Sequence, residues 1–388
     1  MIVKLNQVVD KISGNEDRFS TNLEYYLAGE HYESERIAIY KKGILRDDIN
    51  LLGFKFHFPF VTGDTIFMSR NPHLKKAGMV TFDGICSDTS YVLRTKDESV
   101  LISKFLPLIL QNDHFWAWFE KNKSGSVNYL LNWKTLQEYE FNLPPIDVQK
   151  RISTLVWQME ATRIAYEKLI SATDDLVKSQ FAESFGDPRE NCFGYPCKPL
   201  SEISDILSGI TKGRKPKYNE LTKVPYICTA NVQNGFIDWT ETKYIDATQD
   251  EISKYALLED DILMIEGGDP DKVGRGCLAG VLPEQCIYQN HVFRVRVDKA
   301  LIRPEFLAAY ILLPSTKAYF LWCAKRTTGI ATINRRQLSA LQVMFPPLTE
   351  QDKYIRLVRQ CAKSKFPVVN RNLPRKYKLC LKKAKRFL

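Results

Sequence analysis

Two short basic segments combine cations with residues that keep the backbone in a loop. In the first, TKGRKPK, the cations Lys212, Arg214, Lys215 and Lys217 surround Gly213. Such cations suit contacts with phosphates, and an arginine can bond to two acceptors on guanine. A solvated basic loop has the same composition, so this segment alone does not decide between the two interpretations.

The segment SRNPHLKKAG has the same character in the first half of the chain. It contributes five candidates, Ser69, Arg70, Asn71, Lys75 and Lys76. Arg70 and Asn71 suit two-bond contacts with guanine and adenine, and the two lysines suit phosphates. The Asn-Pro pair marks a loop, where such contacts usually lie.

A glycine-rich segment with mixed charge, EGGDPDKVGRG, supplies a third set of candidates: Glu266, Asp269, Lys272 and Arg275. It lacks the GK[ST] ending of a nucleotide-binding loop. Its acids, with Asp260 and Asp261, could suggest a metal-dependent nuclease, but acids at strand ends are common. We prefer a base-reading loop, with the cations toward the DNA backbone and the acids able to accept from cytosine.

Two further segments place amides at strand edges. YQNHV offers Gln289, Asn290 and His291, and TANVQNG offers Asn231 and Gln233. A structural role and a DNA contact are equally good interpretations of each. The five histidines have no HxH or HExxH spacing, so we expect no metal site.

Catalytic patterns are absent from the sequence. No Ser/His/Asp or Cys/His set can be assembled, and both the NPPY motif and the glycine-rich loop of adenine methyltransferases are missing. The nine cysteines include no CxxC, which favours buried reduced thiols. We expect no membrane span and a cytoplasmic location, because no apolar run resembles a signal peptide or a transmembrane helix.

The segments that must position these candidate residues occur twice in the sequence. NLPPIDVQKRISTLVWQ begins at Asn142 and MFPPLTEQDKYIRLVRQ at Met344, a constant shift of 202 positions. Asn132 with Asn334 and Leu136 with Leu338 keep the same shift. Since a repeat this long indicates duplicated domains, each half is predicted to be a globular domain followed by a helix.

The segment after the first Pro-Pro pair predicts one long helix. Its seam residues are spaced alternately four and three apart: Ile152, Leu155, Met159, Thr162, Tyr166, Leu169, Thr173, Leu176 and Gln180. We assign helix pairing to its apolar members Ile152, Leu155, Met159, Tyr166, Leu169 and Leu176. About 36 residues at 1.5 Å each make a rod of roughly 54 Å. An amphipathic helix packed on its own domain is the alternative.

The fold class predicted is α+β. Two similar mixed α/β domains are joined by long α-helices. The boundaries are 1–143 for the first domain, 144–186 for the first spacer helix, 187–345 for the second domain, and 346–388 for a second helix with a basic tail.

Several long motifs in a fixed order resemble the specificity subunits of type I restriction–modification systems. They are the two PP(I/L)xxQ segments, FAESFGDP, LSEISDILSGITKGRKP, VPYICTANVQNGFIDW and EGGDPDKVGRG with IYQNHVFRVR. The resemblance covers residues 1 to about 363. It implies that the two mixed α/β domains are target-recognition domains and that the long helices pair as an antiparallel coiled coil. It implies a non-catalytic bacterial phage-defence protein that reads a bipartite duplex-DNA target for adenine methylation and restriction by partner subunits.

The resemblance also implies the partners. Two modification (methyltransferase) subunits are expected to dock on the helices, and restriction (translocase and nuclease) subunits join them. S-adenosylmethionine, ATP and Mg²⁺ are expected on those subunits, with no cofactor bound by this chain. At about 3.4 Å per base pair, the rod limits the half-site centres to roughly 16 base pairs.

The C-terminal segment departs from the family pattern. The last 36 residues hold 13 of the 55 Lys and Arg residues and no acid, so the net charge of +10 arises there. Pro367 and Pro374 are predicted to stop the second helix after about four turns. A shifted reading frame or a genuine DNA-holding extension would explain the tail, and an inactive allele that acts only as an interaction scaffold is the alternative function.

Overall fold

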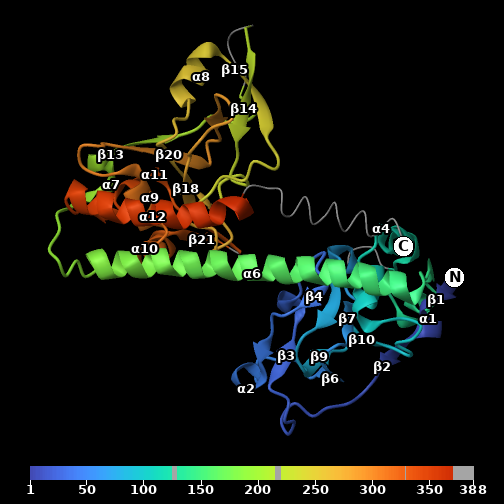
Figure 1. The fold of residues 1–388 in the computed structure, drawn as a ribbon. Helices are drawn as coiled ribbons and strands as arrows, with labels where there is room; N and C mark the ends of the chain where they lie inside the picture. The colour runs from blue at the N-terminus through green and yellow to red at the C-terminus, as the bar shows by residue number, and fades with distance from the viewer. Residues whose placement is uncertain (125–128, 215–219, 328, 370–388) are drawn as a thin grey trace. The chain divides into compact units, whose positions relative to one another are not determined.

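The computed structural model describes the backbone of residues 1–124, 129–214, 220–327 and 329–369, coloured along the sequence in Figure 1. The chain forms two compact units, Met1–Lys168 and Leu169–Pro367, each with its own core. The boundary between them falls within the long helix α6 (Ile146–Phe185). The tail from residue 370 onward lies outside the described residues.

The first unit contains a mainly antiparallel five-stranded sheet of order β2-β10-β7-β8-β4. Its strands are β2 (Val9–Ile12), β10 (Ser90–Thr95), β7 (Thr65–Met68), β8 (Ala77–Val80) and β4 (Ala38–Ile39). Side chains alternate along these strands, so Phe67 and Tyr91 enter one core while Ile66 and Val92 enter another. Helices α3 (Leu106–Leu110) and α4 (Asp113–Asn122) contribute seven buried residues to the first core.

A second sheet of the first unit has the order β5-β3-β9-β6 and shares the other core. Its strands are β5 (Gly43–Ile44), β3 (Tyr25–Leu27), β9 (Gly84–Ser87) and β6 (Phe56–Phe60). The short helices are α1 (Leu5–Val8), α2 (Leu45–Asp48) and α5 (Trp133–Leu136). Strand β1 (Ile2–Lys4) pairs antiparallel with β11 (Glu140–Asn142), so the unit's first and last strands lie together.

The second unit repeats this plan. Its antiparallel sheet β13-β20-β16-β18 consists of β13 (Ser204–Ser208), β20 (Val292–Val297), β16 (Ile262–Ile265) and β18 (Gly276–Leu278). A second sheet has the order β15-β14-β19, with β15 (Lys243–Ala247), β14 (Thr222–Ile227) and β19 (Ile287–Tyr288). Strands β12 (Cys197–Pro199) and β23 (Gln342–Met344) pair as β1 and β11 do. The predicted mixed architecture of both halves is thus confirmed.

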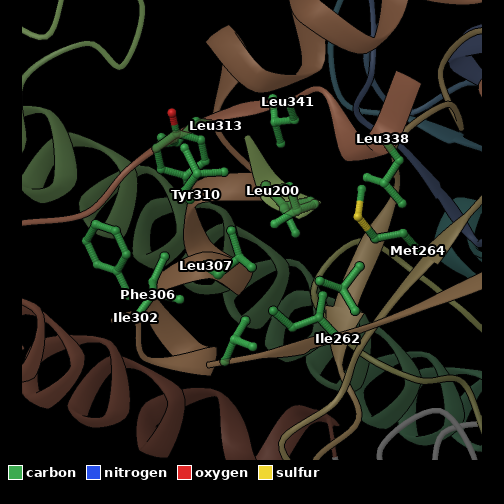
Figure 2. Close-up of a cluster of buried hydrophobic side chains, with 14 of the residues drawn as sticks. Leu200, Ile262, Met264, Ile302, Phe306, Leu307, Tyr310, Leu313, Leu338 and Leu341 are labelled. Atoms are coloured by element: carbon green, nitrogen blue, oxygen red, sulfur yellow. The ribbon is translucent and has the colours of Figure 1, made fainter. Parts of the chain in front are cut away.

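A small third sheet of the second unit has the order β17-β22-β21. It consists of β17 (Gly267–Gly268), β22 (Ile330–Thr332) and β21 (Lys325–Thr327). The unit's helices are α7 (Leu200–Ile203), α8 (Gln249–Tyr255), α9 (Pro304–Ile311), α10 (Pro314–Cys323) and α11 (Arg335–Ser339). Figure 2 shows the main core, where Ile262 and Met264 of β16 meet Phe306, Leu307 and Tyr310 of α9.

The repeated glutamine has a definite structural role in the first unit. Gln149 is 1% exposed in the first turn of α6. Its Nε2 donates to the carbonyl oxygens of Pro144 and Val100 at 2.9 and 2.8 Å, and its Oε1 accepts from the Ile102 amide at 3.1 Å. One side chain therefore satisfies three backbone groups and fastens the start of the helix to the domain.

Gln351 makes the same three bonds in the second unit. It is fully buried in the first turn of α12 (Leu348–Val369). Its Nε2 donates to the carbonyls of Pro346 and Leu301 at 2.7 and 3.2 Å, and its Oε1 accepts from the Arg303 amide at 2.8 Å. The sequence repeat is therefore a repeat of hydrogen-bonding geometry.

A buried aspartate is duplicated in the same way. Asp64 receives two bonds from Arg94, at 2.7 and 2.9 Å, and Asp261 receives two from Arg296, both at 2.7 Å. The two aspartates are 1% and 0% exposed. Asp261, considered above for a nuclease site, is thus occupied by a structural ion pair.

Helix α12 runs alongside the C-terminal part of α6 in the opposite direction within the second unit (Figure 1). The ring of Tyr354 lies 5.4 Å from that of Phe181 and 5.6 Å from that of Phe185. The Tyr354 hydroxyl donates to the Val177 carbonyl at 3.2 Å. Antiparallel pairing of the long helices, as predicted, is therefore carried by aromatic side chains here.

The residues assigned to helix pairing lie elsewhere. Ile152 and Met159 pack against the first unit's core, while Leu155, Leu169 and Leu176 are 52%, 46% and 47% exposed. Tyr166 is half-buried. The heptad pattern missed the pairing side chains because α6 packs against the first core near its start and against the second core near its end, with different faces.

The predicted early stop of the second helix is wrong. Helix α12 continues through Pro367 to Val369, a length of 22 residues. Pro367 lies in its last turn, where the missing N–H costs one backbone hydrogen bond and the helix ends two residues later.

No single helix within the described residues is long and apolar enough to cross a membrane. Helices α9 and α10 reach that length only as a pair bent by 65°. Their side chains Phe306, Leu307 and Phe320 are buried in the second core.

Candidate nucleic-acid interface

Several predicted residues of the second unit contact one another around the ends of β16 and β20. His291 Nδ1 lies 2.6 Å from Glu266 Oε2. Arg275 donates to Gln233 Oε1 at 2.9 Å, although these residues are 42 positions apart. We call the surface formed by residues 229–233, 266–275 and 288–291 the loop surface.

The segment before β20 supplies the middle of the loop surface. Gln289 Oε1 accepts from the Thr229 amide at 3.4 Å, and the Asn290 amide donates to the Ile210 carbonyl at 3.0 Å. The side chains of Gln289 and Asn290 are half-buried, and His291 is 55% exposed. Backbone contacts therefore fix this segment while its side chains still reach solvent.

The glycine-rich loop is held in place by a lysine that was not among the predicted residues. Lys317 of α10 donates to the carbonyls of Pro270 and Asp271 at 3.3 and 2.8 Å. Burial lowers the pKa of Lys317 from its usual value. Within the loop, Asp269 and Lys272 form an ion pair with each other. The loop is thus held in a defined conformation by contacts with α10 and by ion pairs of its own side chains.

Close approach explains one of the glycines in this loop. Gly274 has a φ of +69°, and a Cβ there would lie 2.3 Å from a ring carbon of Phe320. Any larger residue would push the loop off α10 and strain the backbone. Gly274 therefore sets how closely the loop surface is seated on the core.

Asn231 lies inside the fold, and this corrects its place among base-reading candidates. It is 7% exposed. Its Nδ2 donates to the carbonyls of Asp238 and Glu241 at 2.8 and 2.9 Å, and its Oδ1 accepts from the Cys228 amide at 2.9 Å. The amide is fully used in shaping the loop.

Arg214 is also occupied within the protein. It forms two bonds of 2.6 Å to the Glu251 carboxylate and one of 3.0 Å to the Asp246 carbonyl. This arginine lowers the pKa of Glu251 to about 2. The guanidinium thus has little capacity left for guanine. Of the neighbouring cations, Lys212 is exposed, while Lys215 and Lys217 lie outside the described residues.

In the first unit, the predicted segment follows β7 and is tied to the chain near residue 130. Arg70 is exposed and forms a β-bridge with Leu130. Asn71 is half-buried with a left-handed backbone, φ +48°. Ser69 is 2% exposed and donates to the Thr89 carbonyl at 2.7 Å, so it shapes the strand end and does not face solvent.

The two lysines of this segment are partly occupied. Lys75 Nζ lies 3.1 Å from Glu35 Oε1, and Lys76 Nζ donates to the Gly29 carbonyl at 2.8 Å. Both side chains are half-buried. Arg70 is therefore the most accessible cation that the prediction supplied here.

Three exposed cations of the second unit were missed. Lys325 begins β21, and Arg335 and Arg336 begin α11. Across the third sheet, both Lys325 and Gly267 pair with Thr332, which places this sheet directly beside the loop surface. The signal was present in AKRTTGIATINRR, which has cations at both ends of a predicted turn.

A charged cleft of about 520 Å³ occurs in the second unit at the start of α12. It is lined by Asp260, Lys299, Arg303, Pro304, Glu305, Asp352, Ile355, Arg356 and Arg359. Most of these charges pair across the cleft, as Arg303 does with Asp352 at 2.8 Å. Within the described residues, no group of three His, Cys, Asp or Glu side chains is placed to hold a metal ion.

Comparison with known proteins gives a match to one family. The family is described as the type I restriction modification DNA specificity domain, and its model matches residues 1–173 and 197–364. The two matched ranges correspond to the two halves of the structural repeat and together cover most of the chain.

The sequence identities to individual relatives are low. The specificity subunit of the type I restriction enzyme EcoKI, from Escherichia coli K12, is 22% identical over 297 residues, 71% of this chain and 62% of that protein. The putative MjaX specificity subunit of Methanocaldococcus jannaschii is 29% identical over 162 residues, 41% of this chain and 38% of that one. The chain therefore spans less than two thirds of the length of either relative.

Solved structures share the fold. The crystal structure of a type I restriction-modification system S subunit from M. genitalium superposes with a TM-score of 0.55 at 13% sequence identity, covering 99% of this chain and 95% of that one. With the family model matched in both halves, the chain belongs to the type I restriction modification DNA specificity domain family.

Proposed function

We propose that this chain is a DNA-reading specificity subunit without catalytic activity of its own. Its two units each contact one half of a bipartite duplex target. The observation that carries the proposal is the duplication of a complete structural unit, down to the bonds of Gln149 and Gln351. Two copies of one reading surface fit a target with two separated parts.

Exposed cations on both units support contact with a polyanion. Arg70 lies in the first unit, and Lys325, Arg335 and Arg336 lie in the second. These side chains can neutralise phosphates, while the loop surface presents Gln233, Glu266 and His291 for base edges. Side chains with both kinds of chemistry are thus available on one unit.

The partners belong to the same proposal. Modification subunits would hold S-adenosylmethionine and methylate adenine where this chain directs them, and restriction subunits would supply ATP- and Mg²⁺-dependent cleavage. The relatives named above are specificity subunits of type I restriction enzymes, which supports this assignment.

The test is to co-express the chain with a modification subunit from the same host and to map methylated adenines in the DNA. We expect a split motif with a fixed gap, absent when the modification subunit is expressed alone. Methylation without such a motif, or none from a well-assembled complex, would contradict the proposal.

Single substitutions can then assign each half of the motif to a unit. Arg70→Ala should relax only one half and His291→Ala only the other, because the two side chains are exposed and lie on different units. Relaxation of both halves by either substitution would argue against two independent readers.

A further inference from the structure

Trp322 is exposed to a degree that is unusual for tryptophan. It lies in the last turn of α10 and is 83% exposed. The other tryptophans are buried or half-buried: Trp116, Trp118, Trp133, Trp157 and Trp239. A large aromatic side chain left in water contributes little to folding, and tryptophan is enriched at interfaces.

The backbone that carries Trp322 is firmly held. Tyr319, one turn earlier, donates from its hydroxyl to the Gln337 carbonyl at 2.8 Å. Gln337 in turn donates to the Cys323 carbonyl. The Trp322 ring lies 6.4 Å from that of Tyr319. The indole is thus presented to solvent from a fixed position.

The fold does not require an aromatic residue at this position. Helices α4 and α10 occupy equivalent places in the two units and have ten residues each. The ninth residue is Lys121 in α4 and Trp322 in α10, and both are exposed. The indole therefore distinguishes the two units without serving their shared architecture.

The surroundings of Trp322 have positive charge. Lys325 follows three residues later on β21, and Arg335 and Arg336 are exposed on α11, the helix bonded to the end of α10. Ile330, on the paired strand β22, is 50% exposed. Apolar side chains surrounded by cations are complementary to a nucleic acid, whose bases and sugars lie between phosphates.

We propose that Trp322 is a DNA-contacting residue of the second unit. Its indole packs against the sugar and base edges beside that unit's half-site, while Lys325 and Arg335 contact the flanking phosphates. This inference rests on the proposed function and adds a residue outside the loop surface. It makes recognition by the two units chemically unequal, with an aromatic contact in the second and a lysine in the first.

The experiment uses the purified full chain and two duplexes of equal length, one carrying the mapped motif and one with shuffled sequence. Acrylamide quenching of tryptophan fluorescence reports Trp322 because it is the most exposed tryptophan. We expect the target duplex to protect this signal. Trp322→Ala should weaken target binding about tenfold, Trp322→Phe should weaken it less, and Lys198→Ala, an exposed lysine on the separate β12–β23 sheet, should not change it.

Each contrary result has a distinct meaning. Normal target binding with unprotected Trp322 and unchanged affinity of Trp322→Ala would overturn this inference and leave the proposed function intact. Protection by a modification subunit in the absence of DNA would overturn it in favour of a protein contact. Failure of the wild type to prefer the target duplex would overturn the proposed function, and this inference with it.

Discussion

At the residue scale, the candidate interface consists of side chains that are held by the protein and side chains that are left exposed. Asn231 and Arg214 use their polar atoms within the fold, while Lys325 and Arg335 reach solvent. The sequence singled out the candidate loops but could not separate these roles. Glu251, the partner of Arg214, is 37 positions away, so the segment TKGRKPK gives no sign of this ion pair.

Removing an exposed cation should alter the salt dependence of DNA binding. For Lys325→Ala or Arg335→Ala, the slope of log K against log salt should become shallower by about 0.9, because one phosphate contact fewer releases one counterion fewer. Binding titrations between 50 and 200 mM salt measure this. Lys198→Ala is the matched control, and an equal change in that variant would show a general charge effect.

Glu251 should make folding stability depend on pH. Its pKa is held at about 2 by Arg214, below its usual 4.5. The ion pair therefore stabilises the folded state above pH 4.5, and this contribution is lost as the pH falls toward 2. Glu251→Gln should lower the free energy of unfolding by about 1 kcal/mol at pH 7 and by roughly half as much at pH 3.

Urea unfolding at the two pH values measures that difference. Asp250→Asn, an exposed acid on the same helix, is the control. A loss that is as large at pH 3 as at pH 7 would show that Glu251 acts through packing and not through its charge.

At the element scale, the long helices were predictable in number and place because the Pro-Pro and Gln signals are local. The faces by which these helices pack against the two cores were not predictable. Val156 enters the first core and Phe181 the second, so one helix serves two hydrophobic environments and no single heptad describes it. The length of α12 was underestimated because Pro367 removes one N–H from the helix without ending it, and α12 continues for two more residues.

The buried glutamine at the start of each long helix should contribute strongly to folding stability. Gln351→Ala leaves three backbone groups without their partner, and we expect a loss of about 2 to 3 kcal/mol in the free energy of unfolding. Gln360→Ala, an exposed glutamine on the same helix, should change it by under about 0.5 kcal/mol. Equal effects of the two substitutions in urea unfolding would show that the Gln351 bonds contribute no stability.

At the scale of the whole molecule, the duplication was the strongest prediction and is confirmed by shared topology and matching bonds. Most of the excess positive charge lies in the C-terminal tail and not in the candidate interface. Residues 370–388 hold eight of the Lys and Arg residues and no acid, so they supply most of the net charge of +10.

Deleting residues 370–388 should therefore separate general from specific binding. Affinity for the shuffled duplex should fall severalfold at 100 mM salt, and the ratio between target and shuffled affinities should rise. Parallel titrations with both duplexes measure this. A loss of preference for the target would instead assign recognition to the tail.

The pairing of β1 with β11, and of β12 with β23, has a consequence for how such proteins can change. Each unit starts and ends at one place, beside the helix that follows it. Most of the unit lies between those strands as one insert, and the helix glutamine bonds to backbone groups of that insert at residues 100–102 and 301–303. A whole unit can thus be exchanged as one insert, provided that the new insert keeps the short segment to which the helix glutamine is bonded.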